Sequence, residues 1–551
     1  MILPPTTRRA AFWCIAALLL AITCVLHFWR IGSVPPGFTG DECSIAYNAY
    51  CIARTGADEY GTSWPMYFRG MDGYFSPVVV YSVVPPIAAF GLETWAARLP
   101  CALYSLLACV TFSMLLRHWR FEAPLAVAGG FMLSVIPWIF PVSRSCTYVG
   151  NAFALWMLVT GLALTSSALR RRSTWRAVLA GAVWALVFYT HQSIQPVVAL
   201  LAIGCVVVLW RPLVQRWRLI LVMALSALLF LLPLIISVLR SPEGLTARFH
   251  QVSITNKAAS IPDMMASVTS QYLDYFSPQF LFISGDPQPR HHTGHGGELY
   301  WFIAPLILTG LYVAIRYWRQ HASHRIILVG TLVSPVTAAL TVDQMHSTRC
   351  MYAVIFWLLL ALVGAQWLWQ RRGQWRKLLL LIVCAGVLEI ALYLRNYFGP
   401  GYQSSCRDFQ QGQLADSLKY CFQHLSQDEV LYVSDSTFSP HGWIVNAELK
   451  PFLYAYVLFY GKIDPRKYQQ TGFPMDTVRL YDNNAPKPGL LLRCNFRLSS
   501  TTEPRGTGFA GDEFVVDLLA RNDEPLPADS ILLTRIPFPD PDVQFEVFKI
   551  P

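Results

Sequence analysis

Charged residues are scarce in this 551-residue chain and make up only 14% of it. Apolar residues account for 54%, and the mean hydropathy is +0.39. A soluble protein of this length carries far more charge, so the composition excludes a soluble globular protein and indicates a polytopic membrane protein. The net charge of +10 comes largely from Lys and Arg in short loops between apolar runs, which argues against a nucleic-acid partner.

The chain also lacks the cysteine patterns of metal and redox sites. None of its 13 cysteines forms a CxxC pair or a zinc-finger spacing. Cys406, Cys421 and Cys494 are expected on the outer side of the membrane, where a disulfide is chemically permitted, but an odd number leaves the pairing open. A small-residue cleavage site is missing after the first apolar run, which indicates a retained anchor.

Apolar runs of spanning length predict about 11 transmembrane helices. They lie near 10–29, 95–116, 123–142, 151–169, 177–195, 196–210, 219–239, 299–315, 326–342, 350–369 and 378–394. With the N-terminus in the cytoplasm, the basic loops RHWR, RRRSTWR, RPLVQRWR, RYWRQHASHR and RRGQWRK all fall on the cytoplasmic side. The shorter run at 76–91, which contains Pro85 and Pro86, is expected to be a re-entrant or interfacial helix on the outer face.

The last part of the chain differs in composition from the rest. It is more polar, with the strand-like runs EVLYVSD, TVRLYD, GLLLRCNFRL and EFVVDLLA and a helical stretch around 407–424. We therefore expect an extracytoplasmic α/β domain over 395–551. It follows a membrane domain over 1–394, which has a first outer loop at 30–94 and a long outer loop at 240–298. The protein is expected in the inner or plasma membrane as a multi-pass protein.

Ionisable residues that this topology places outside come from five separate loops. Charge at a membrane boundary is costly, so such a set predicts a functional site, although each residue alone could simply mark the boundary. The set comprises Asp41, Glu42, Asp58, Glu59, Arg69 and Asp72, then Arg144, then His191, then Asp286, Arg290, His291, His292 and His295, and finally Asp343, His346 and Arg349.

The sequence GDE at 40–42 precedes an amphipathic run that ends at Gly56. Taken alone, it is typical of a helix start, with Asp41 as the N-cap and Glu42 in the first turn. One face of this helix is apolar and consists of Ile45, Ala49, Ile52 and Ala53. This face predicts a helix that lies in the membrane interface. A carboxylate at the helix N-terminus stays ionised at neutral pH and can act as a general base.

The histidine-rich sequence RHHTGH has two interpretations. Arg290 together with one or more imidazoles can bind a phosphate, and Arg349 can do the same. A divalent metal held by His291, His292 and His295 is the less favoured alternative, because the spacing matches no strong metal signature. We therefore expect no metal and no required cofactor.

A carboxylate pair and several cations on one side of a membrane suit sugar transfer from a polyprenyl phosphate. The anomeric carbon of such a donor is bonded to phosphate, so the leaving group needs charge stabilisation more than protonation. The attacking hydroxyl then needs one general base, whereas hydrolysis of an ordinary glycoside requires a second carboxyl group to protonate the leaving oxygen.

Several segments together resemble the C-type glycosyltransferases (GT-C). They are GDECSIAYNAYCIARTGADEYG, WPMYFRGMDGYFSPVVVYS, FGLETWAARLPCALYSLL, IPWIFPVSR, YTHQSIQP, SPQFLFISGDPQPRHHTG, MHSTR and LFYGKIDPRKY. They are similar to bacterial members akin to the aminoarabinose-lipid A transferase and the protein O-mannosyltransferases. The resemblance implies a GT-C fold and inverting transfer of a sugar, on the outer side of the membrane, from a polyprenyl-phosphate donor to a glycan, lipid or protein hydroxyl.

The resemblance also implies roles for residues. Asp41 corresponds to the general base, with Glu42 beside it in the same motif. Two positions depart from the family pattern: Ser76 stands where many relatives have a phosphate-contacting lysine, and Tyr148 stands where many have an acidic residue. Donor phosphate binding is then expected at Arg69, Arg290, His291, His292 and Arg349, and other substrate contacts at Asp72, Tyr74, Arg144, His191 and His346.

Two other classes of function stay open. A lipid-linked-sugar flippase or other transporter would tend to show paired halves and helices broken at the midplane, and no internal repeat is visible here. A polysaccharide polymerase or ligase also uses lipid-linked donors but need not begin with an acidic first loop.

Overall fold

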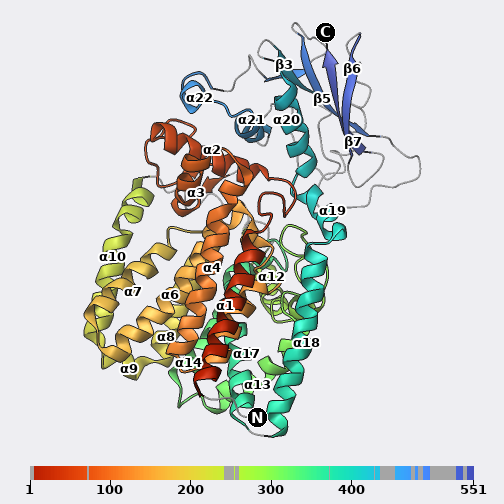
Figure 1. Ribbon diagram of the computed structural model, residues 1–551. Helices are drawn as coiled ribbons and strands as arrows, with labels where there is room; N and C mark the ends of the chain where they lie inside the picture. The colour runs from red at the N-terminus through yellow and green to blue at the C-terminus, as the bar shows by residue number, and fades with distance from the viewer. Residues whose placement is uncertain are drawn as a thin grey trace. The chain divides into compact units, whose positions relative to one another are not determined.

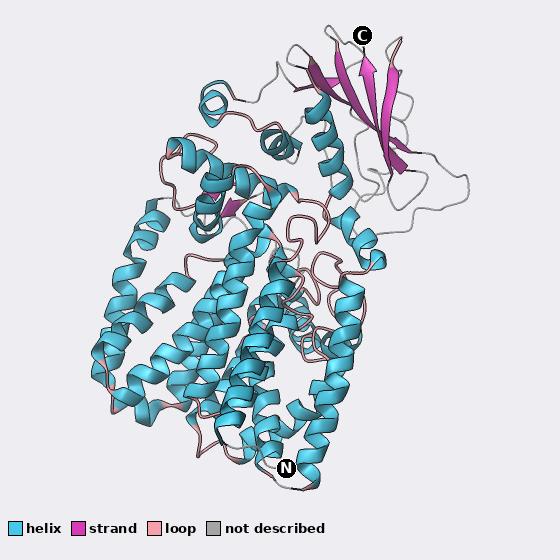
Figure 2. Ribbon diagram, viewed as in Figure 1, coloured by secondary structure: helices cyan, strands magenta, loops and turns pink. Residues whose placement is uncertain are grey.

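The computed structural model is mostly helical, and most of its strands gather in the C-terminal part (Figures 1 and 2). It describes residues 5–70, 73–240, 253–254, 260–371, 373–426, 429–434, 453–472, 478–481, 488–496, 529–537 and 543–550. Asp72 and the run EFVVDLLA lie outside these residues. The chain forms two compact units. Unit 1 contains Met1–Ile31, Gly73–Ser82 and Arg98–Tyr402, and unit 2 contains Gly32–Asp72, Val83–Ala97 and Gln403–Pro551.

Unit 1 is built from apolar helices that run side by side (Figure 1). The longer ones are α1 (Pro5–Phe28), α4 (Thr94–His118), α6 (Val149–Arg171), α10 (Trp217–Arg240), α17 (Ala353–Gln370) and α18 (Gln374–Tyr397). The shorter ones are α3 (Pro77–Phe90), α5 (Ala123–Val135), α7 (Thr174–Val187), α8 (Ile194–Val208), α9 (Trp210–Val214), α12 (Ile261–Asp274), α13 (Ala304–Arg316), α14 (Ala322–Val333), α15 (Val336–Ala339) and α16 (Ser347–Cys350). Helices α3 and α4 each continue into unit 2.

Seven segments of the described chain are long and apolar enough to cross a membrane, as in a multi-pass membrane protein. They are Ala10–Phe28, Thr94–His118, Cys146–Arg171, Trp217–Arg240, Ala322–Ala339, Ala353–Gln370 and Gln374–Tyr397. The other four expected spans contain the shorter helices α5, α7, α8 and α13, so the count of 11 is not confirmed. Helix α5 ends at Val135 because Ile136, which precedes Pro137, is extended. A helix, α3, does occupy the run at 76–91, and its placement in the membrane stays a prediction.

Helix α17 is the most deeply buried of the seven segments, and it packs closely on α13. A Cβ atom at Gly310 would lie 1.8 Å from the Leu360 carbonyl oxygen, and one at Gly364 would lie 2.1 Å from that of Leu306. The two backbones therefore touch directly, which only glycine permits at these positions.

Unit 2 contains a five-stranded sheet in the order β4-β3-β5-β7-β6, against which α20 (Gly412–His424) packs (Figure 2). Its strands are β3 (Val430–Ser434), β4 (Val478–Tyr481), β5 (Gly489–Phe496), β6 (Ile531–Pro537) and β7 (Val543–Ile550). Strand β3 is parallel to β4 and β5, whereas β7 is antiparallel to β5 and β6. Strands β3, β4 and β5 fall within the runs EVLYVSD, TVRLYD and GLLLRCNFRL, respectively. Cys406 and Cys421 are both buried, and the side chain of Cys494 is not among those described.

Unit 2 also contains α2 (Gly40–Thr55), which packs on α21 (Leu453–Tyr460) and α22 (Pro465–Thr471). The predicted apolar face is buried at Ile45, Ala49 and Ile52 and exposed at Ala53. The Tyr47 hydroxyl donates a hydrogen bond to the Ile463 carbonyl at 3.1 Å. Protein therefore covers this face instead of lipid, and the placement of the helix at the membrane interface stays a prediction. The first loop groups with the C-terminal segments, and the expected boundary at 394/395 falls inside α18.

The remaining short elements lie close to these helices in the chain. They are the strands β1 (Phe68–Arg69) and β2 (Tyr74–Phe75), the single turns η1 (Val142–Arg144), η2 (Cys146–Tyr148), η4 (Gln279–Ile283) and η5 (Trp301–Ile303), and helix α19 (Pro400–Phe409). The expected helical stretch at 407–424 thus consists of the end of α19 and the whole of α20.

Candidate functional site

A capping box closes the start of α2. Thr39 is the N-cap, and its side chain accepts a hydrogen bond from the Glu42 N–H at 3.2 Å. In return, Glu42 Oε2 accepts one from the Thr39 N–H at 3.2 Å. The expectation that Asp41 is the N-cap is therefore wrong, because Thr39 already fills that position. Asp41 lies instead in the first turn, where the helix dipole favours a negative charge.

The two neighbouring carboxylates differ in exposure. Glu42 is fully buried, and its carboxylate serves the cap. Asp41 is half-buried. Of this pair, Asp41 is therefore the carboxylate that a substrate can reach, whereas the structure gives Glu42 a local role in holding the helix start.

A second acidic side chain of unit 2, Glu59, is buried among polar partners. Its Oε1 accepts hydrogen bonds from Asn48 Nδ2 at 3.0 Å and from the Tyr454 hydroxyl at 3.2 Å. Burial raises the pKa of Glu59 to about 8, against the effect of these two hydrogen bonds. Arg69, expected to bind phosphate, is exposed, and its guanidinium lies 5.0 Å from the centre of the Tyr60 ring.

In unit 1, the loop that follows η4 contains a hydrogen-bonded aspartate–histidine pair. His291 Nδ1 lies 2.8 Å from Asp286 Oδ2, and His291 Nε2 lies 2.7 Å from the Tyr148 hydroxyl. Asp286 Oδ2 also accepts hydrogen bonds from the backbone N–H and the hydroxyl of Ser347, at 2.8 and 2.9 Å. These contacts join three segments that are far apart in the sequence, namely the start of α6, the loop before α13, and α16.

Two further side chains complete this group. The His346 ring lies 4.7 Å from that of His291, centre to centre. Arg349 Nη2 pairs with Asp343 Oδ2 at 2.5 Å, whereas Arg349 Nη1 is buried and has no hydrogen-bond partner among the described residues. We call the group the imidazole cluster, which consists of Tyr148, Asp286, His291, His346, Ser347 and Arg349.

The charges of the imidazole cluster follow from burial and hydrogen bonding. Burial acts to raise the pKa of Asp286. The charge of His291 and its hydrogen bond act in the opposite direction, as do His346 and the Gln288 N–H. Together they outweigh the effect of burial, so the pKa of Asp286 lies below its usual value. Burial, with His291 and Arg349 nearby, brings the pKa of His346 well below 6.5. At neutral pH His346 is therefore an uncharged imidazole beside a guanidinium.

Three side chains of the cluster also offer possible metal-ligand atoms within 4.8 Å of one another: Asp286, His291 and His346. This set differs from the histidine triplet considered from the sequence, since it includes neither His292 nor His295. Both ring nitrogens of His291 lie at hydrogen-bond distance from Asp286 and Tyr148, so a metal would have to replace those bonds. The expectation of no metal stays a prediction.

Two residues expected to contact substrate instead have structural partners. Arg144 is fully buried, and its Nη2 donates to the Trp29 carbonyl at 2.6 Å, just past α1. His292 is 1% exposed; its Nδ1 accepts from the Gly294 N–H at 3.1 Å and its Nε2 lies 3.3 Å from the Gly297 carbonyl oxygen. Both side chains hold backbone segments in place, so neither is a strong candidate for direct phosphate contact.

The remaining expected residues of unit 1 are more accessible. Tyr74 and Arg290 are half-buried, and His191 is exposed. A Cβ atom at Gly150 would lie 3.6 Å from the His191 nitrogen and 3.9 Å from Ser76 Oγ, so these two segments flank the start of α6 just after Tyr148. The structure thus places His191 and Ser76 close to the start of α6, next to Tyr148 of the imidazole cluster.

Comparison with known proteins identifies the fold. No family model and no curated relative matches the sequence. Two crystal structures of ArnT from Cupriavidus metallidurans, one bound to undecaprenyl phosphate and one in the apo state, each match with a TM-score of 0.53. The identities are 15% and 14%, and the matches cover 99% and 98% of this chain and 98% of each ArnT chain. The chain therefore has the GT-C glycosyltransferase fold expected from its sequence.

Proposed function

We propose that the protein is an integral membrane glycosyltransferase that moves a sugar from a polyprenyl-phosphate donor to a hydroxyl of a glycan, lipid or protein on the outer face of the membrane. The fold shared with ArnT, one structure of which is bound to undecaprenyl phosphate, supports this proposal. The observation that carries it is the buried Arg349 Nη1, which has no partner in the described chain and belongs to a guanidinium near the His346 imidazole. A phosphate oxygen is the natural acceptor for such a donor.

The imidazole cluster would bind the donor phosphate. When the bond between the anomeric carbon and the phosphate oxygen breaks, negative charge grows on that oxygen. Arg349 offers a positive charge and an unused N–H, and His346, neutral when the cluster is empty, can take up a proton as the charge develops. Tyr148, in place of an acidic residue, orients His291 without adding a negative charge. Arg290 and Arg69 are further proposed phosphate contacts.

Asp41 would act as the general base. It takes the proton of the acceptor hydroxyl while that oxygen bonds to the anomeric carbon on the side opposite to the phosphate. The carbon–oxygen bond to phosphate breaks, the configuration inverts, and the products are a glycoside and the polyprenyl phosphate. Asp41 is preferred to Glu42 for this role, because Glu42 is buried and bound to Thr39.

The test is Asp41→Asn in the purified full-length protein, offered a panel of polyprenyl-phosphate sugars and analysed by mass spectrometry. We expect turnover to fall roughly 100- to 10,000-fold with membrane insertion and thermal stability unchanged. Asp416→Asn is the matched control, since Asp416 is an exposed carboxylate of the same unit that pairs with Arg407. Unchanged turnover in Asp41→Asn would disprove the base assignment. Lipid scrambling without product would favour a transporter, and a glycan extended by many successive sugars would favour a polymerase.

A further inference from the structure

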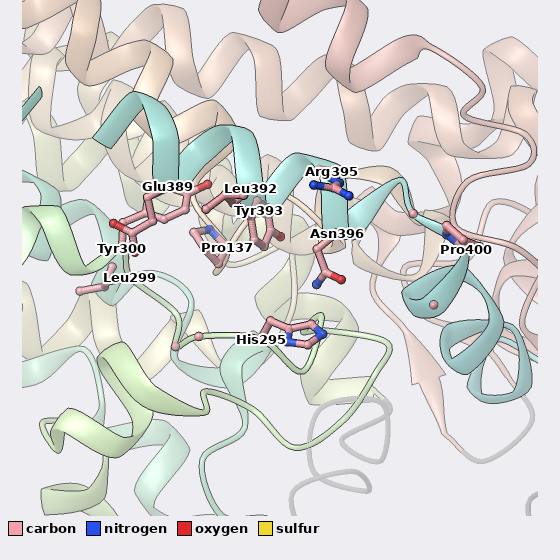
Figure 3. A pocket seen from close by; sticks show the side chains of 14 residues that line it. Pro137, His295, Leu299, Tyr300, Glu389, Leu392, Tyr393, Arg395, Asn396 and Pro400 are labelled. Carbon is pink, nitrogen blue, oxygen red and sulfur yellow. The ribbon is translucent and has the colours of Figure 1, made fainter. Parts of the chain in front are cut away.

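A cavity of about 550 Å³ lies between the last turns of α18 and the loop that precedes η5 (Figure 3). Its polar lining consists of His295, Glu389, Tyr393, Arg395 and Asn396, and its apolar lining includes Pro137, Leu299 and Leu392. None of these side chains belongs to the imidazole cluster. The cavity is therefore separate from the proposed donor phosphate site.

Two hydrogen-bonding groups of the cavity have no partner in the described part of the chain. The Tyr393 hydroxyl is one of them, and its side chain is only 7% exposed. The other is the Nδ2 of Asn396, and Figure 3 shows this amide directed toward His295. Buried polar groups are usually paired, so two unpaired ones in a single cavity point to a polar ligand.

The charges of the cavity favour an anion at one end. Glu389 also lines the cavity, but its two oxygens accept the backbone N–H groups of Trp301 and Phe302 at 2.7 and 3.0 Å. Arg395 lies six residues further along α18, which is about 9 Å along the helix axis. The end of the cavity at Arg395, Asn396 and His295 thus offers a cation and hydrogen-bond donors, away from the carboxylate.

The surface of α18 beside the cavity suits a lipid chain. This helix is one of the seven apolar segments of spanning length, and few of its residues are buried. Leu388, which directly precedes Glu389, and Leu392, which belongs to the apolar lining, are 62% and 54% exposed. A molecule that fills this end of the cavity from the bilayer would lay an apolar chain on these residues.

We propose that this cavity binds the headgroup of an anionic phospholipid, with its phosphate at Arg395, Asn396 and His295 and its acyl chain along α18. The site goes beyond the proposed sugar transfer and does not depend on it. A cation and neutral hydrogen-bond donors are suited to bind a phosphate. The exposed apolar surface of α18 can also bind an acyl chain, so a phospholipid fits this site better than a free anion from water does.

The test compares lipid retention by native mass spectrometry of the full-length protein. The probes are phosphatidylglycerol and diacylglycerol, which share acyl chains and differ in the phosphate headgroup. We expect wild type to retain phosphatidylglycerol preferentially. Arg395→Gln combined with Asn396→Leu should weaken this retention about tenfold or more, as expected for loss of charge-assisted hydrogen bonds. Arg376→Gln, at the opposite end of the same helix, is the matched control and should retain the lipid like wild type.

Two additional variants distinguish this site from the imidazole cluster and from nonspecific adhesion of lipid to α18. Tyr393→Phe removes one hydroxyl and conserves the ring, so it should weaken retention by a few-fold and leave folding intact. Arg349→Gln should leave phosphatidylglycerol retention unchanged. Equal retention of diacylglycerol, displacement of the lipid by inorganic phosphate alone, or loss of the lipid in Arg349→Gln would each overturn the proposal.

Discussion

The capping box of α2 and the imidazole cluster are both buried polar groups, yet their hydrogen bonds are completed in different ways. Thr39 and Glu42 hydrogen-bond to each other, so both side chains of the cap are paired within the protein. In the imidazole cluster, Arg349 keeps a buried N–H without a partner in the described residues. Such a group costs roughly 1–3 kcal/mol, and a ligand can offset this cost. An unused donor therefore marks a binding site better than charge or burial alone.

The largest effect in this comparison is expected from two arginines of unit 1, of which Arg144 is fully buried and Arg349 is 13% exposed. Arg349→Gln should lower sugar transfer roughly 100- to 1,000-fold, because it removes the charge that stabilises the leaving phosphate, while the protein stays folded. Arg144→Gln should instead lower thermal stability, since the Trp29 carbonyl loses its donor inside the protein. Turnover and melting temperature, measured on both variants, check this. Equal loss of stability in the two variants would contradict the assignment of Arg349 to ligand binding.

Glu59 provides a test of a carboxyl group whose role is structural. Its pKa is about 8 in the folded protein and 4.5 ordinarily, so the folded state holds the proton more tightly, and stability falls as the pH rises through this window. Glu59→Gln has no proton to lose. As the pH rises through this window, the melting temperature of Glu59→Gln should therefore increase relative to that of wild type. A pH-independent difference between the two would show that Glu59 is ionised in the folded protein.

His346 is expected to link phosphate binding to proton uptake. In the free protein burial holds its pKa well below 6.5, so the ring is neutral, and a bound phosphate would raise that pKa. Affinity for a polyprenyl phosphate should then increase as the pH falls from about 8 to about 6, by at most tenfold per pH unit. His346→Asn should remove this part of the dependence. The same pH profile in both proteins would exclude His346 from the phosphate site.

The smallest effect should come from the cap itself. Thr39→Ala should cost about 1 kcal/mol of folding free energy, because the Glu42 N–H loses its acceptor. Thr39→Ser keeps the hydroxyl and should restore most of the stability. Thermal unfolding of the three proteins measures this, with sugar transfer as a second readout. A loss of transfer far greater than the loss of folded protein would mean that the cap also controls Asp41.

The sequence was sufficient for the features that depend on local patterns. Apolar runs located the longer helices of unit 1, whereas α12 lies in the expected long outer loop, and strand-like runs located β3, β4 and β5. The N-cap was misassigned because Thr39 and Asp41 are both good capping residues, and only the reciprocal bond to Glu42 distinguishes them. The apolar face of α2 was expected to contact lipid, whereas protein covers it. An apolar stripe does not reveal whether lipid or another helix covers it.

The imidazole cluster could be predicted only in part. Asp286, His291, His346 and Arg349 were all expected from charge at the predicted outer face. Ser347 was missed, because a serine beside a histidine carries no signal of its own, and its bond to Asp286 spans 61 residues. Tyr148 was noted only as a departure from the family pattern, and its partner His291 lies 143 residues away. Pairings over such separations depend on the helix packing, which local patterns do not encode.

The glycine contact between α13 and α17 has a consequence for the chemistry. Helix α13 follows the loop that carries Asp286 and His291, and α17 follows the segment that carries His346 and Arg349. The close backbone contact at Gly310 and Gly364 thus fixes the distance between the two helices, and with it the separation of these two segments. Adding one methyl group at either glycine would push the helices apart. The rate of the proposed sugar transfer would then fall, although no residue that contacts the substrate had been changed.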